Sequence, residues 1–182
     1  MWIVIAAVVV AVIICVVAYA WWRQHSNQQR TERLQGQFGQ EYDRVVEEKG
    51  RKEAETDLAQ RQERVEAMPL QPLTPGQTEQ FASLWTATQA RFVDDPGGAV
   101  TDADRLVADV MRTRGYPVGD FEQRAADVSV DHPQVVANYR AAHDIAIRHS
   151  RAEATTEELR QAMVHYRALF ADLLETAAPV AR

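Results

Sequence analysis

The sequence predicts an all-α protein with an N-terminal transmembrane helix, a polar helical stalk, a Pro-rich spacer and a C-terminal bundle of four to five helices. Three observations favour this fold: an uncharged apolar run opens the sequence, apolar residues recur every three or four positions, and capping residues, Pro and Gly separate the helical stretches. The expected divisions are 1–22 for the transmembrane helix, 23–68 for the stalk, 69–74 for the spacer, 75–176 for the bundle and 177–182 for a tail.

The first element is an apolar run that carries no charged residue from position 2 to position 22. As a helix it would extend about 31 Å, which matches the hydrocarbon core of a bilayer. Aromatic side chains that favour the headgroup boundary stand at both ends: Trp2, Tyr19, Trp21 and Trp22. A cleaved signal peptide is the alternative, because Ala18-Tyr19-Ala20 resembles a cleavage site, but no basic residue precedes the run. We therefore expect the lipid bilayer to surround this segment.

The charges beside the apolar run predict its orientation. Arg23, Arg30 and Arg33 follow it against one acid, Glu32, whereas no Lys or Arg precedes it. Cytoplasmic flanks of membrane spans carry the excess of basic residues. We therefore expect a single-pass protein of the cell (inner) membrane with a cytoplasmic C-terminal domain; an extracytoplasmic domain is the alternative.

The polar segment after the span is predicted to be a helical stalk. Leu34, Phe38, Tyr42 and Val45 follow one another at spacings of four, four and three, which puts them on one helix face. Fewer than three clean heptads follow, so a coiled coil stays an alternative to a single solvated helix. Gly36 and Gly39 weaken the helix by about 1 kcal/mol each relative to Ala, and they indicate a flexible or closely packed joint.

The spacer and the bundle follow from Pro and from capping residues. Pro69, Pro72 and Pro75 are three positions apart, the period of a polyproline II helix. Five bundle helices are then expected to open at Thr74-Pro75, Asp95-Pro96, Asp120, Asp131-His132-Pro133 and Thr155. The first ends near Val93, Gly115 ends the second and the third fades by Val128.

Four segments of the sequence resemble a known protein family. They are RLQGQFGQEYDR, ARFVDDP, RGYPVGDFEQRAADVSVDHPQVVANYRAAH and LRQAMVHYRALF. The family is an uncharacterised one of small bacterial, mainly actinobacterial, membrane-anchored or "secreted" proteins, and the similarity spans residues 33–174. The resemblance implies no activity, cofactor or site residue.

Charge and motif content exclude several classes of function. Residues 67–182 contain 16 acids and 11 arginines, a balance of −5, so no nucleic-acid partner is expected. No phosphate-binding glycine motif follows a strand pattern. The single Cys15 excludes an intrachain disulfide. His132, His143 and His149 are six or eleven positions apart, which prevents two of them from sharing one ion; we expect neither a metal nor a cofactor.

The central loops hold the only candidates for catalysis. These candidates are Asp131, His132, Tyr139 and His143, with Asp120 and Arg124 nearby. A carboxylate beside an imidazole could act as an acid/base pair. The alternative is structural: Asp120 and Asp131 would be N-caps, and His143 would line the core.

These observations lead to three hypotheses about function. The first is a membrane-anchored interaction or scaffold protein with a protein partner or a homo-oligomeric state. The second is an enzyme with a pocket around residues 115–132, and the third is an envelope stress-associated protein that faces outward. A pocket containing the candidate residues and a nearby carboxylate would favour the enzyme, whereas a continuous exposed apolar patch on a bundle helix would favour the interaction protein.

Overall fold

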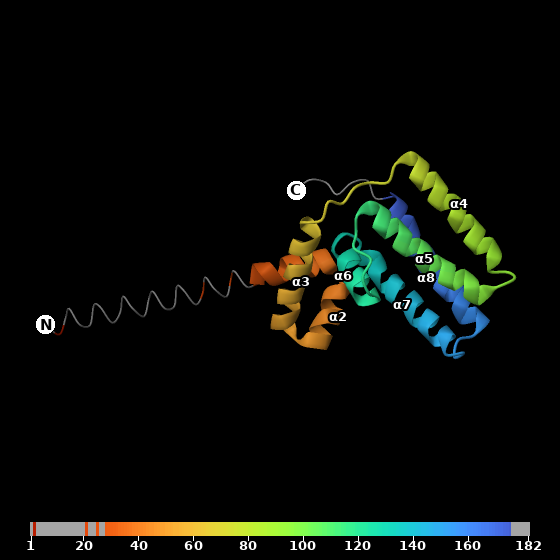
Figure 1. Ribbon diagram of the computed structural model, residues 1–182. Coiled ribbons are helices and arrows are strands. Elements are labelled where there is room, and N and C mark those ends of the chain that lie inside the picture. The colour runs from red at the N-terminus through yellow and green to blue at the C-terminus, as the bar shows by residue number, and fades with distance from the viewer. Residues whose placement is uncertain (1, 3–20, 22–24, 26–27, 176–182) are drawn as a thin grey trace.

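The computed structural model describes Trp2, Trp21, His25 and residues 28–175, and every element in that part of the chain is an α-helix (Figure 1). The all-α prediction is thereby confirmed. The helices are 28–38, α2 (Gln40–Lys49), α3 (Arg51–Glu66), α4 (Pro75–Arg91), α5 (Pro96–Arg114), α6 (Phe121–Asp131), α7 (Pro133–Ser150) and α8 (Thr156–Glu175).

The expected transmembrane helix lies outside this description. Of residues 1–22, only Trp2 and Trp21 are described, and the tail 177–182 is also outside. Among the residues that are described, no helix combines the length and the apolar character needed to cross a bilayer.

The five bundle helices begin close to the predicted positions, and four of them have the side-chain cap that the sequence predicted. Thr74 and Gln77 make a capping box at the start of α4, and the Asp95 side chain accepts from the Gly98 amide at 2.9 Å at the start of α5. Gly115 ends α5 in the left-handed conformation, at φ 100°. The prediction for α6 was too short, since this helix continues to Asp131 rather than fading at Val128.

The bundle is organised around α8, which packs against both α5 and α7. Its buried face is largely apolar, and α4 covers α5 from outside (Figure 1). The rings of Trp85 on α4 and Phe170 on α8 stack at 4.8 Å between centroids. This stacking and the contact with α5 hold α4 in place.

The expected stalk does not extend from the bundle. The helix breaks at Gly39, α2 and α3 fold back on each other at Gly50, and the pair packs on α6 and α7 (Figure 1). The predicted face of Leu34, Phe38, Tyr42 and Val45 is therefore buried in the core rather than in a coiled coil. The interpretation of this region as one solvated helix was wrong. Gly39 and Gly50 adopt positive φ, 50° and 78°, and these two residues interrupt the helix so that it can fold back.

Charged side chains join the α2–α3 pair to the bundle. The carboxylate of Glu41 on α2 accepts hydrogen bonds from Arg61 of α3 at 2.9 Å and from Arg140 of α7 at 3.2 Å. Arg64 of α3 donates to the fully buried Asp127 of α6 at 2.8 Å. Buried ion pairs of this kind tolerate little change of geometry, so they fix how the pair sits on the bundle.

The Pro-rich segment is also packed rather than free. The amide of Gln71 donates to the carbonyl of Arg114 at 2.9 Å, and Leu70 and Leu73 are partly buried against the core. A Cβ at Gly115 would lie 3.0 Å from the carbonyl oxygen of Pro69. The segment therefore closes over the C-terminal end of α5.

Candidate functional site

The junction between α6 and α7 holds the first polar group of the interior. His132 is 1% exposed, and its Nδ1 donates to the Asp172 carboxylate at the end of α8. Its Nε2 lies 3.5 Å from Nη1 of Arg114 and so acts as the acceptor. Burial lowers the pKa of His132 against the opposing effect of Asp172. The imidazole is therefore neutral and fixed in one tautomer.

Arg114 is the cation of this group and the largest of the fully buried side chains. Its Nη1 donates to the carbonyl oxygen of Leu173 at 3.0 Å, which caps the last turn of α8. Its Nε has no hydrogen-bond partner among the described residues. Arg112, two residues earlier in the sequence, is by contrast exposed.

The two aspartates predicted as N-caps behave differently. Asp120 caps α6 and accepts from the Gln123 amide at 2.8 Å, as expected. Asp131 does not cap α7, whose N-cap is His132. Instead its carboxylate accepts from the hydroxyl of Tyr116 at 2.8 Å, and burial and this carboxylate raise the pKa of the phenol. Asp131 thus fixes the loop that follows α5.

Tyr139 and His143 belong to a second polar group, farther along α7. The Tyr139 hydroxyl accepts from Nε of Arg124 at 2.9 Å, and burial raises its pKa to about 12. The ring of His143 stacks on Phe121 at 3.5 Å between centroids, and burial lowers its pKa. The group is completed by Asp104, which accepts from the Tyr166 hydroxyl at 3.1 Å.

The structure therefore separates the four catalytic candidates: His132 lies in the first polar group, Tyr139 and His143 lie in the second, and Asp131 is hydrogen-bonded to Tyr116. His132 has a carboxylate partner but is enclosed, with each ring nitrogen facing a neighbouring side chain. The Nδ1 atom of His143 is buried and has no hydrogen-bond partner among the described residues. The surroundings of His132 and of His143 therefore suit packing and hydrogen bonding in the interior better than proton transfer to a substrate.

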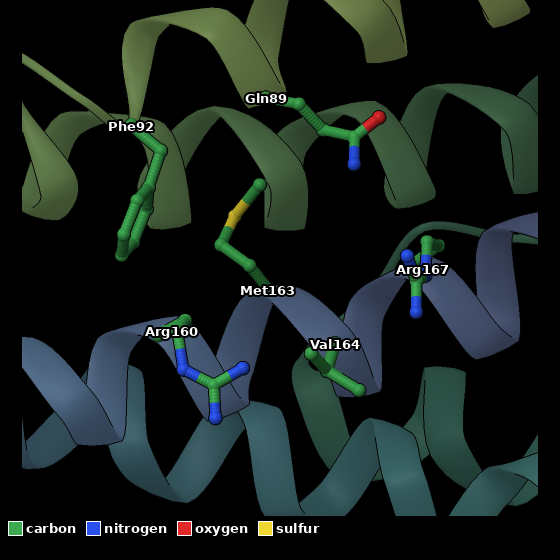
Figure 2. Close-up of a pocket in the computed structure, with 6 residues that line it drawn as sticks. All are labelled: Gln89, Phe92, Arg160, Met163, Val164 and Arg167. Carbon is green, nitrogen blue, oxygen red and sulfur yellow. The ribbon is translucent and has the colours of Figure 1, made fainter.

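An open hollow lies elsewhere, between α4 and α8, with a volume of about 170 Å³ (Figure 2). The α8 side contributes Arg160, Met163, Val164 and Arg167, and the α4 side contributes Gln89 and Phe92. Val164 is 41% exposed, whereas its neighbour Met163 is 8% exposed. We refer to these six residues as the α4–α8 hollow.

A second hollow borders α4 on its other side, between α4 and α5. Its volume is about 340 Å³, and Leu84 and Leu106 are among its apolar lining residues. Leu84 is an exposed aliphatic side chain, and the rim contains Arg91 and Asp102, which pair with each other at 2.5 Å. The lining of this second hollow holds two arginines and two aspartates, whereas the lining of the α4–α8 hollow holds two arginines and no acid.

The sequence did not identify Arg114, Asp172 or Asp104 as partners of the candidate residues, nor Arg160 and Arg167 as part of a surface. Only the i, i+3, i+4, i+7 spacing of residues 160, 163, 164 and 167 could have indicated a shared helix face. In the described part of the chain, no three His, Cys, Asp or Glu side chains are grouped so that they could hold a metal ion.

Comparison of the chain with family models, with curated proteins and with solved structures finds no match in any of the three.

Proposed function

We propose that this protein is a membrane-anchored interaction module that binds a protein partner at the α4–α8 hollow. The observation that supports this proposal is the hollow itself, which is open to solvent and has Phe92, Met163 and Val164 in its lining, with Val164 41% exposed. Concave surfaces with apolar side chains in their lining are typical of binding sites. The interior polar groups support no comparable case for an enzyme, because His132 is enclosed and His143 is stacked on Phe121.

The proposal includes an anchor in the bilayer formed by residues 1–22. Its support is the uncharged apolar run of the sequence, long enough as a helix to span the hydrocarbon core. The three arginines that follow the run favour a cytoplasmic bundle. Such a protein would hold its partner at the inner face of the membrane.

A matched pair of surface variants tests the binding site. Val164→Asp places a charge in the hollow, whereas Ile147→Asp makes a similar change on α7, at a residue of nearly equal exposure, 41% against 40%. Affinity capture from membranes is carried out with the intact protein and with both variants. Loss of a captured protein with Val164→Asp alone supports the site; equal capture by all three contradicts it.

The anchor is tested separately by fractionation and N-terminal sequencing. We expect the protein to stay with the membrane after alkaline carbonate extraction and to begin at Met1. Mature protein that begins at Trp21 and stays in the supernatant would contradict the anchor without bearing on the hollow.

A further inference from the structure

We infer that the partner segment docked in the α4–α8 hollow is an acidic amphipathic helix, with acids at positions i and i+7 and apolar residues at i+3 and i+4. This inference rests on the proposed function and adds the chemistry of the partner.

The first argument is the order of side chains along α8. Arg160, Met163, Val164 and Arg167 occupy positions i, i+3, i+4 and i+7 and share one face. Figure 2 shows the two arginines on either side of Met163 and Val164. Seven residues of helix place them about 10 Å apart along the axis. A partner helix that lies along this face has the same rise per residue. Acids at its positions i and i+7 would therefore be as far apart as the two arginines and could pair with both.

The second argument is the charge of the surface. The protein has a formal net charge of −6, yet residues 80–93 of the α4 side and 159–171 of the α8 side contain no Asp or Glu. Arg167 has no ion-pair partner in the described part of the chain. Arg160 is held by Glu157 at 2.7 Å, one turn away from the hollow. The lining of the hollow therefore contains two arginines, of which Arg167 is unpaired among the described residues, and no acid, and complementary charge favours a carboxylate-bearing partner.

The third argument is the shape of the site. Phe92 and Met163 lie between the two helices, and the apolar volume of about 170 Å³ is open to solvent. Helices bind in such grooves by inserting one or two apolar residues from a single face. Gln89 at the edge supplies an amide that can bond to a partner's polar groups.

The probe for this site is a blocked, alanine-based peptide of about 18 residues, long enough to form helix in isolation. It contains Glu-Ala-Ala-Leu-Leu-Ala-Ala-Glu. One control peptide has Lys in place of both Glu, and another has Pro between the two apolar residues and the second Glu, which breaks the helix. Binding to the full-length protein in detergent micelles is measured by fluorescence anisotropy at low and high salt.

We expect the Glu peptide to bind at least about tenfold more tightly than either control, with affinity that falls as salt screens the charges. Arg167→Glu should weaken binding of the Glu peptide about tenfold and strengthen binding of the Lys peptide. Arg151→Glu, the same charge change at an exposed residue after α7, should leave both unchanged. Thermal unfolding of each variant shows that the fold is retained.

Equal binding of the Glu and Lys peptides, absence of binding, or equal binding of the Pro peptide would each overturn the inference. Its failure is separable from failure of the proposed function. If the peptides do not bind while Val164→Asp still loses a captured protein, the hollow docks a partner of other chemistry. If the Glu peptide binds with the expected selectivity while capture is unaffected by Val164→Asp, the chemistry stands and the membrane partner lies elsewhere.

Discussion

Glu41 is 3% exposed and receives hydrogen bonds from the arginines at positions 44, 61 and 140, which come from three different helices. Burial opposes ionisation of this carboxyl, but Arg44 and Arg140 outweigh it and lower the pKa of Glu41. The charge is therefore retained at neutral pH. A buried charge that loses its partner is much more costly than an exposed one.

We expect Glu41→Gln to lower the free energy of unfolding by about 2 kcal/mol, because three arginines would lose a buried charged acceptor while Arg61 keeps Asp57 and Arg140 keeps Glu122. The measurement is denaturant unfolding followed by circular dichroism. Glu157→Gln, which breaks an exposed ion pair with Arg160, is the control and should leave stability within experimental error. If the two variants changed the free energy of unfolding equally, the buried ion pairs of Glu41 would be no more stabilising than the exposed pair of Glu157.

His132 predicts a dependence of stability on pH. Burial lowers its pKa in the folded protein, so below the unfolded value of about 6.5 the unfolded chain binds more protons than the folded one. Stability conferred by the neutral imidazole is present above that pH and is lost as the pH falls. His143, whose pKa is also lowered by burial, contributes in the same direction.

The free energy of unfolding should therefore fall between pH 7.5 and pH 5.5, by at most about 1.4 kcal/mol per pH unit for each histidine. His132→Gln and His143→Gln should each reduce this fall, whatever their stability at pH 7.5. The measurement is denaturant unfolding at both pH values. A fall of unchanged size in both variants would show that neither imidazole is responsible.

At the scale of helices, sequence was most informative where local chemistry decides the outcome. The starts of α4, α5, α6 and α8 were predicted from side chains that cap them, such as Thr155, which forms a capping box with Glu158. The start of α7 was placed correctly by Pro133, although its cap is His132 rather than Asp131. Local signals therefore fix boundaries, whereas the partner of Asp131 depends on tertiary structure.

The glycines at positions 36 and 39 show how backbone conformation separates two residues that look equivalent in sequence. Gly36 lies inside a helix with open space around its Cα, whereas Gly39 has φ 50° and ψ −124°. Ala in place of Gly36 would raise the helix propensity of the segment, whereas Ala in place of Gly39 would have a strained backbone conformation.

We expect Gly36→Ala to raise the free energy of unfolding by about 0.5–1 kcal/mol and Gly39→Ala to lower it by about 1–3 kcal/mol. Both are measured by thermal and denaturant unfolding. Stabilisation by both substitutions would mean that the helix is continuous through residue 39, as in the stalk that the sequence suggested.

For the whole molecule, the sequence predicted the helical content and the five-helix bundle but not the packing of α2 and α3. Their polar composition is typical of a solvated helix, and the contacts that overturn this interpretation join residues far apart, such as Glu41 with Arg140 and Arg64 with Asp127. The same limit applies to the candidate site. Partners such as Arg114 and Asp172 reach His132 across 18 and 40 positions, and no local spacing indicates them.

The radius of gyration in solution distinguishes an α2–α3 pair packed on the bundle from a helical stalk that projects from it. For a chain of residues 28–175 we expect a radius of gyration of about 15 Å, the value for a compact protein of this length. A single helix over 28–66 would by itself be about 58 Å long. Small-angle X-ray scattering measures the difference, and a maximum dimension that requires a projecting rod would contradict the packed α2–α3 pair.

The packing of α2 and α3 on α6 and α7 also has a consequence for biosynthesis. The pair leaves the ribosome before its docking surface, since Arg140 follows Glu66 by 74 residues. At translation rates of roughly 5–20 residues per second, the nascent pair waits for about 4–15 s. During that interval its arginine and glutamate side chains keep it hydrated, so the charges that later hold it in place first protect it from premature aggregation.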